Sequence, residues 1–215
     1  MATDAWTNLS LENHPGYPGI SGSQVWTAPI AQDSASERQS FFQKGPNSTA
    51  DTTDFLPQSA GGGIYSFFSN THFEITSSVA LPGLDTLQLQ ISMAEGATGV
   101  DVFTGPTLTL FTNGGTFTLA PTSSSLLGAV EVTIPAFGDN PTTINLEAYR
   151  WNLAAYAGTI TGVQVDWQVD MHSITYGAQL AQATQAVPEP GNTLLTAFGC
   201  SIAVLRFRSR MRRTA

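Results

Sequence analysis

The chain has 215 residues, of which 41% are hydrophobic and 11% are charged, and its formal net charge at pH 7 is −8. Five of its eight basic residues lie within the last ten positions, so residues 1–205 carry three basic residues against sixteen acidic ones, a balance of −13. Nucleic-acid binding needs Lys and Arg to neutralise phosphates, so an acidic body of this kind excludes nucleic acid as a partner. The length fits a single domain with tails.

Residues 1–60 have little periodicity and many Pro and Gly breakers, including the run from His14 to Gly19. They predict an irregular N-terminal arm held to the body by a few aromatic residues, with a short helix over residues 34–44. The first six residues lack the basic and apolar regions of an export signal. We therefore expect the true start and its signal to lie upstream. Cleavage near the mature N-terminus and insertion directed by the C-terminal segment alone are the alternatives.

From Ile64 the pattern changes to alternating apolar and polar residues in short runs bounded by Gly, Pro or Asn. Runs with this spacing and no long helix between them predict an antiparallel sheet protein. Asn113-Gly114 between two of the runs predicts a hairpin turn. We predict an all-β fold for residues 61–180, an antiparallel β-sandwich of the jelly-roll type. The predicted strands cover residues 64–69, 71–81, 86–93, 107–112, 115–119, 129–134, 143–149 and a long pair within 159–180.

The clearest strand runs from Gly162 to His172 and alternates without interruption. Its odd positions are apolar and include Trp167, which we expect in the core together with Met171. Its even positions are all polar. A shift of one residue would exchange the two faces, so the register of this strand is strongly determined.

The C-terminal 35 residues have a different composition from the body. Residues 181–190 read as a linker that ends in Val187-Pro188-Glu189-Pro190, and residues 191–205 contain no charge. At about 1.5 Å per residue this uncharged run gives a helix of about 22 Å, short of the ~30 Å hydrocarbon core unless the flanking arginines reach toward the headgroups. An amphipathic surface helix is the alternative. A cluster of arginines follows and, by the positive-inside rule, places residues 1–190 outside the cytoplasm: Arg206, Arg208, Arg210, Arg212 and Arg213.

This order of motif, weak spanning helix and arginine cluster resembles the PEP-CTERM sorting signal of Gram-negative bacteria. The resemblance covers residues 187–213 only. It implies that Val187, Pro188, Glu189 and Pro190 form a recognition element for an exosortase-type processing enzyme. It further implies a precursor anchored in the inner membrane by a transmembrane tail, residues 191–215. After removal of that tail, the product would belong to the cell envelope or the extracellular exopolysaccharide matrix.

Two groups of residues in the body are candidates for a ligand face. Asp166, Asp170 and His172 occupy the polar side of the long strand, where they form either a shallow sugar- or cation-binding surface or an ordinary solvated face. Tyr149 and Trp151 flank Arg150, and such a group either holds a sugar ring or packs structurally. If a ligand binds, we expect it to contact the side chains of Tyr149, Trp151, Asp166, Asp170 and His172.

Catalytic and metal motifs are weak. Asp101, Glu131, Glu147 and Asp166 are the carboxylates considered for glycoside hydrolysis, but their spacing in sequence brings no two of them together. The three histidines accompany no nucleophile motif, and no spacing typical of a metal site occurs. The single cysteine, Cys200, lies in the tail, so the body has no disulfide. We expect no catalytic residues and no cofactor, with Ca²⁺ left open as a stabilising ion.

These observations favour an exported, non-catalytic envelope or matrix protein with a β-sandwich body, which would have exopolysaccharide as a further partner. A carbohydrate-binding module is the second hypothesis, and a glycan-cleaving hydrolase is the third. Saturable glycan binding distinguishes the second hypothesis from the first, and release of reducing sugar distinguishes the third.

Overall fold

The structure is a computed structural model that describes residues 1–15, 17, 26, 28–33, 40–45, 53–66, 69–94, 102–133 and 141–184. Contacts divide the chain into two units, residues 1–185 and residues 186–215. All described residues belong to the first unit. The predicted C-terminal helix falls in the second and lies outside the described residues.

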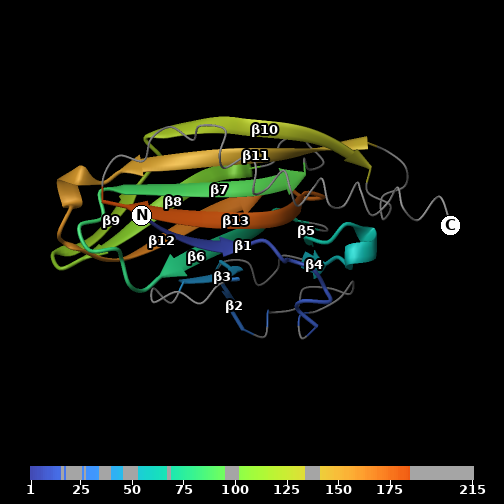
Figure 1. The fold of residues 1–215 in the computed structure, drawn as a ribbon, viewed down its shortest axis with the longest axis horizontal. Helices are drawn as coiled ribbons and strands as arrows, with labels where there is room; N and C mark the ends of the chain where they lie inside the picture. Colours follow the sequence, from blue (N-terminus) through green and yellow to red (C-terminus); the bar gives the residue numbers. More distant parts are fainter. Residues whose placement is uncertain are drawn as a thin grey trace. The chain divides into compact units, whose positions relative to one another are not determined.

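The first unit consists of two antiparallel sheets (Figure 1). Sheet A has seven strands in the order β10-β11-β7-β13-β5-β4, with β1 also paired to β13. Sheet B has six strands in the order β2-β3-β6-β12-β8-β9. The strands are β1 (Ala2–Trp6), β2 (Ile30–Ala31), β3 (Ser40–Lys44), β4 (Thr53–Phe55), β5 (Ile64–Ser66), β6 (Thr71–Ser77), β7 (Thr86–Ala94), β8 (Val102–Thr112), β9 (Gly115–Leu119), β10 (Ser123–Thr133), β11 (Pro141–Asn152), β12 (Ile160–Val169) and β13 (Ile174–Ala183).

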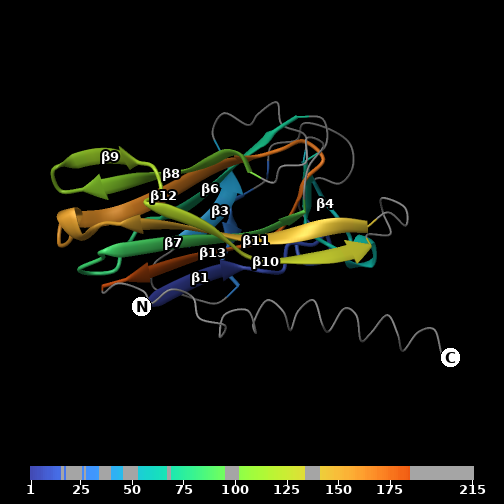
Figure 2. The same cartoon turned by 90° about the horizontal axis from the view of Figure 1, so that it is seen from above.

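The two sheets pack face to face, as the side view in Figure 2 shows. A single large cluster of buried apolar residues takes members from both, for example Leu89 of β7 and Val165 of β12. Two short 3-10 turns, residues 58–60 and 154–156, are the only helical elements among the described residues. The predicted all-β, antiparallel class is therefore confirmed, with a β-sandwich arrangement of the sheets.

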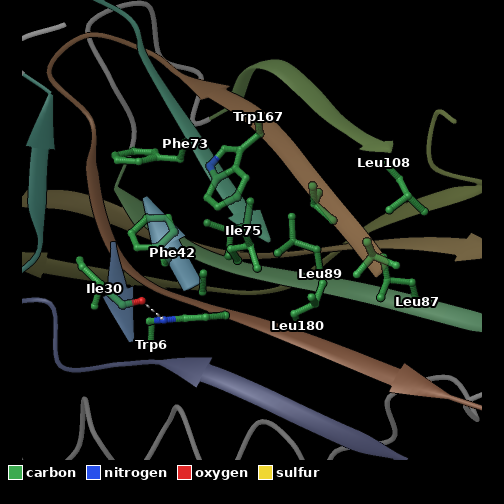
Figure 3. Packing of buried hydrophobic residues seen from close by; sticks show 14 of the residues in the cluster. Trp6, Ile30, Phe42, Phe73, Ile75, Leu87, Leu89, Leu108, Trp167 and Leu180 are labelled. Carbon is green, nitrogen blue, oxygen red and sulfur yellow. Dashed lines mark hydrogen bonds between the residues drawn. The ribbon is translucent and has the colours of Figure 1, made fainter. Parts of the chain in front are cut away.

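An aromatic group lies at the centre of the core between β3, β6 and β12 (Figure 3). The ring of Phe42 stacks on Trp167 at a centroid distance of 5.7 Å and contacts Phe73 at 5.2 Å. Trp167 is 2% exposed, as the alternation of its strand predicts. Trp6 packs against Phe42, and its indole N–H donates a hydrogen bond to the Ile30 carbonyl at 3.0 Å. This bond links the first strand of the chain to the edge strand of sheet B.

The N-terminal segment is more regular than the sequence predicts. Residues 1–55 contribute four strands, and Ser40–Lys44 is the strand β3 where the sequence predicted part of a helix. The adjacent aromatics Phe41 and Phe42 explain the difference. In a strand, neighbouring side chains point to opposite faces, so Phe42 enters the core while Phe41 stays exposed on the outer face. Burial of one large ring outweighs the weak local helix preference.

The turns follow the local sequence. The Asn113-Gly114 hairpin is confirmed, since Thr112 pairs with Gly115 at its base. Gly63 has a φ of +95°, and a Cβ there would lie 2.5 Å from a methyl group of Ile174, so this position requires glycine. The long polar strand ends earlier than predicted, at Val169, and residues 170–173 form the turn that joins sheet B to sheet A.

The edge strand β10 contains a β-bulge. Its register against β11 shifts between Leu126 and Gly128, which pair with the neighbours Glu147 and Leu146. The extra residue reverses the alternation, so Leu126 and Val130 point to opposite sides of the sheet although both have even numbers. Both side chains are exposed.

Asp54 on β4 is a buried carboxylate. It lies opposite Tyr65 on β5 and is 1% exposed, and neither of its carboxylate oxygens has a well-formed hydrogen bond from the described residues. Burial disfavours the charged form and raises the pKa of Asp54 to about 6, against a smaller lowering by the Phe55 amide. The ionised side chain of Asp54 therefore destabilises the folded body at neutral pH.

Replacement of Trp167 by alanine should lower the free energy of unfolding by about 3–5 kcal/mol, the usual cost of removing a large aromatic from a core. Met171→Ala is the matched control. Met171 was predicted to share the core face with Trp167, but it lies in the turn and is 36% exposed. Its truncation should cost less than about 1 kcal/mol. Denaturant titration measures both, and an equal loss in the two variants would contradict this description of the core.

The substitution Asp54→Asn should stabilise the protein at neutral pH and not at acidic pH. The pKa of Asp54 is raised in the folded state, so the penalty is absent below the unfolded pKa of about 4 and complete above about 6. We expect the variant to gain about 1–3 kcal/mol near pH 7 and nothing near pH 4. Urea titrations at the two pH values measure the gain, and a loss of stability at neutral pH would show that Asp54 has a stabilising partner.

Candidate functional site

The outer face of sheet B carries a continuous set of polar side chains, which we call the polar face. Each side chain alternates along its strand with a residue of the core, because successive residues of a strand point to opposite sides. The polar face consists of Gln43 on β3, His72, Glu74 and Thr76 on β6, Gln164, Asp166 and Gln168 on β12, and Thr107 and Thr109 on β8.

The register of sheet B brings two carboxyl groups side by side. Glu74 pairs with Asp166 across β6 and β12, Gln43 extends the same row on β3, and Thr107 extends it on β8. Directly opposite residues in an antiparallel pair have Cβ atoms about 4.5–5.5 Å apart. Glu74 is only 5% exposed, and Asp166 is half-buried. Two acidic groups thus meet on a face that is otherwise uncharged apart from His72.

Neutral donors hold this carboxyl pair in place. Oε1 of Glu74 accepts hydrogen bonds from the Gln43 amide at 2.7 Å and from the Thr76 hydroxyl at 2.8 Å. The Gln164 amide donates to Oε2 of Glu74 at 3.1 Å and to both carboxylate oxygens of Asp166 at 3.1–3.2 Å. A single amide therefore bridges the two acidic residues.

The environment raises the pKa of Asp166 to about 6. Burial is the largest cause, and the negative charge of Glu74 and a hydrogen bond to it act in the same direction. The Gln164 amide and the positive charge of His72 oppose the shift. Near pH 6 Asp166 is therefore present in both its protonated and its ionised form.

Two exposed phenylalanines flank the polar face. Phe41 on β3 pairs with Thr76 and is 40% exposed. This pair lies two residues along the strands from the pair of Gln43 and Glu74. Phe111 on β8 pairs with Gly162, where the missing side chain leaves its ring accessible, and is 36% exposed. Three strand spacings and an offset of two residues separate the two rings by about 16 Å. An aromatic ring thus borders the polar groups on each side.

Of the predicted candidate ligand face, the structure places only Asp166 on this surface. The prediction that Asp170 and His172 share a strand face with Asp166 is wrong, because β12 ends at Val169. Asp170 is buried in the turn, where its side chain accepts a hydrogen bond from the Met171 amide at 2.9 Å. A Pro or Gly signal at this turn is absent, so the alternation alone could not show where the strand stops.

His172 has a structural contact of its own in this turn. Its φ is +64°, the left-handed conformation, in the turn that joins the two sheets, and its Nδ1 lies 2.6 Å from the hydroxyl of Tyr65. Its backbone N–H donates to the Ser66 carbonyl at 2.6 Å. Both contacts tie the β12–β13 turn to β5 of sheet A.

Tyr149 and Trp151 belong to β11 of sheet A and point toward the core, so they do not form a surface with Asp166. Trp151 is 1% exposed, and its indole N–H donates to the Leu119 carbonyl at 3.2 Å. Tyr149 is half-buried against the core, and its hydroxyl donates to Glu147. The alternative of structural packing therefore applies to both aromatic residues.

The carboxylates considered for hydrolysis do not assemble. Asp101 lies outside the described residues, and Glu131 and Glu147 belong to β10 and β11 of sheet A. Asp166 instead faces Glu74, which the sequence analysis did not single out. The alternation of Thr71–Ser77 already places Glu74 on an outer face, but only the pairing register reveals its neighbour.

The sorting motif Val187–Pro190 and all five tail arginines lie outside the described residues. Within the described part of the chain, no helix has the length and apolar character needed to cross a membrane. The same part contains no group of three or more His, Cys, Asp or Glu side chains arranged to hold a metal ion.

Comparisons with known proteins give the chain no family. No protein-family model matches it, and no curated protein matches it. A solved structure, the enzymatically active domain of tailspike protein 4 from bacteriophage CBA120, resembles it with 14% sequence identity and a TM-score of 0.29. The alignment covers 82% of this chain and 20% of the tailspike chain, so this chain spans about a fifth of that protein. A likeness at this level carries no argument about function.

Proposed function

We propose that this chain is an exported, non-catalytic protein of the cell envelope or the exopolysaccharide matrix, sorted through its C-terminal segment. The order of Val187–Pro190, the uncharged run and the arginine cluster supports the sorting step. An exosortase-type enzyme would remove the tail from a precursor anchored in the inner membrane. A body with no cysteine and few charged residues, built from sheets, suits an environment outside the cytoplasm.

We further propose that the sandwich is of the jelly-roll type. The order β5-β13-β7-β11 in sheet A and the order β6-β12-β8-β9 in sheet B support it. Consecutive strands from β5 to β8 alternate between the two sheets, and β11, β12 and β13 alternate again. An eight-stranded double sheet with such connections is the jelly-roll pattern, here extended by strands at its edges.

Within this role, the polar face of sheet B favours carbohydrate binding as the activity of the body. The observation that supports it is the juxtaposition of exposed Phe41 and Phe111 with a row of amide, hydroxyl and carboxyl groups. Ligand surfaces commonly combine aromatic contact area with a few fixed polar groups that determine orientation. A polysaccharide likewise has apolar ring faces next to hydroxyl groups, so it could contact the phenylalanine rings and the polar row together.

The same geometry favours binding over glycoside hydrolysis. Two-carboxylate glycosidases hold their carboxyl groups about 5–5.5 Å or 6.5–9.5 Å apart, with space between them for the sugar or for water. Glu74 and Asp166 instead interact through a hydrogen bond, and the Gln164 amide occupies both. The site lies on an open sheet, where nothing described shields a bond from water.

Substitution of Glu189 by alanine should leave the C-terminal segment attached, because the motif would no longer be recognised. The intact mass of protein from a host with the matching processing enzyme measures this directly. A Thr193→Ala variant serves as the control outside the motif and should be processed normally. Normal processing of the Glu189 variant would count against sorting through this signal.

Removal of either exposed ring should weaken glycan binding about tenfold while the fold stays intact. A contact residue of this size commonly contributes more than 1 kcal/mol, and about 1.4 kcal/mol corresponds to a factor of ten. The variants are Phe41→Ala and Phe111→Ala, and Leu126→Ala on β10 of sheet A is the matched control. Glycan-array screening followed by calorimetry measures the affinities. Saturable binding that all three variants retain would show that the ligand binds elsewhere.

A further inference from the structure

We infer that the polar face takes a polysaccharide carrying positively charged amino groups, of the glucosamine type, in preference to neutral or uronic-acid glycans. The inference rests on the proposed carbohydrate-binding function and adds the chemical class of the ligand. It follows from the charge left over at the Glu74–Asp166 pair and from the position of that pair beside Phe41.

Among the described residues, the carboxyl pair has no fully charged cation as a hydrogen-bond partner. Its hydrogen-bond donors are Gln43, Thr76 and Gln164, which are all neutral. Of the elements packed around it, β3 contributes Gln43 to this face and β8 contributes Thr107 and Thr109. Lys44 pairs with the buried Phe73. Because side chains alternate along a strand, Lys44 therefore lies on the side of the sheet opposite to the polar face.

His72 is the one basic side chain of the described polar face. It lies two residues from Glu74 on β6, and its charge reaches Asp166. The interaction opposes only part of the shift that burial and Glu74 cause at Asp166. A cationic group of a ligand would therefore find uncompensated negative charge at the centre of the face.

The geometry lets one ligand use the ring and the charge together. Phe41 and Glu74 are diagonal neighbours on β3 and β6, a relation that spans about 7–8 Å. A sugar packed on Phe41 thus places its substituents above the carboxyl pair. Asp166 is half-buried, so a substituent of the bound sugar can reach it. Glu74 is buried and adds its negative charge to the site from beneath the surface. A cation can also contact the face of the ring itself.

Anionic glycans lack this complementarity. A uronic-acid carboxylate placed on the same face would meet two acidic groups, and like charges at short range are costly. The body adds a general repulsion, since residues 1–205 carry a balance of −13. A neutral sugar meets no such penalty but gains nothing from the pair.

Ligand charge and the protonation of Asp166 are coupled. An ammonium group near the pair favours the ionised form, so it lowers the pKa of Asp166 from its value of about 6 and releases a proton on binding. Affinity for the cationic ligand should therefore rise as the pH increases through about 6. His72 is the other ionisable side chain close to Asp166, and the variant His72→Gln tests whether the pH dependence comes from Asp166.

The experiment compares three soluble oligosaccharides of equal length by calorimetry at about pH 5 and about pH 6.5. They are a glucosamine oligomer, its N-acetylated form and an oligogalacturonate. We expect the glucosamine oligomer to bind about tenfold more tightly than the acetylated form at the higher pH, and the oligogalacturonate to bind least. Asp166→Asn should abolish the preference, so that the glucosamine oligomer and its acetylated form bind with equal affinity. Glu131→Gln on β10 removes one negative charge from the other sheet and should change nothing.

The outcomes separate this inference from the function on which it rests. Equal affinity for the acetylated and free-amine oligomers, or a preference for the uronate, would overturn the inference and leave carbohydrate binding intact. A preference for free amines that persists in Asp166→Asn would also overturn it, because the acidic body alone would then attract the ligand. Absence of binding to all three would instead remove the proposed carbohydrate-binding function. Circular dichroism and denaturant titration of the variants exclude misfolding as the cause.

Discussion

The register of β12 between β6 and β8 is the constraint on which the polar face depends. Burial of Trp167 and of the valines beside it fixes which residues of β12 face outward, because a slip of one position would expose all of them. The same packing therefore sets the core and places Asp166 opposite Glu74. The packing of the core and the arrangement of the polar face in sheet B share one structural cause.

Residues 1–205 contain only three basic residues, so carboxylates such as Glu12 and Asp33 accept hydrogen bonds from neutral groups. Where backbone and hydroxyl donors suffice, the charge is accommodated. Glu12 accepts hydrogen bonds from the Gln58 amide, which lowers its pKa, and Asp33 accepts hydrogen bonds from the amide and hydroxyl of Thr7. Where such donors are missing or shared, the carboxyl group retains its proton to higher pH, as at Asp54 and Asp166. Burial is the largest cause of the raised pKa at both positions.

The sequence predicts local periodicity well, but it predicts poorly which residues from distant segments lie next to each other in the fold. The alternation around Trp167 and the Asn113-Gly114 turn were sufficient to predict a core residue and a hairpin, because both depend on residues adjacent in the chain. Glu74 and Asp166 are far apart in sequence, so their meeting depends on a pairing register that no local pattern encodes. The choice between sugar contact and structural packing for Trp151 stayed open for the same reason, since the core cluster that buries it takes residues from both sheets. The end of β12 lacked a local signal, so Asp170 and His172 were placed on the wrong element.

The bulge at Leu126 and Gly128 limits how copies of this chain can associate through their sheet edges. A straight edge strand with exposed backbone groups can add a strand from another copy and so polymerise sheet to sheet. The bulge interrupts the ladder of β10 midway and increases its twist, so a second copy cannot pair along the whole edge. It also divides the exposed apolar side chains between two sides of the sheet. The β10 edge therefore resists extension of sheet A by a strand from another copy.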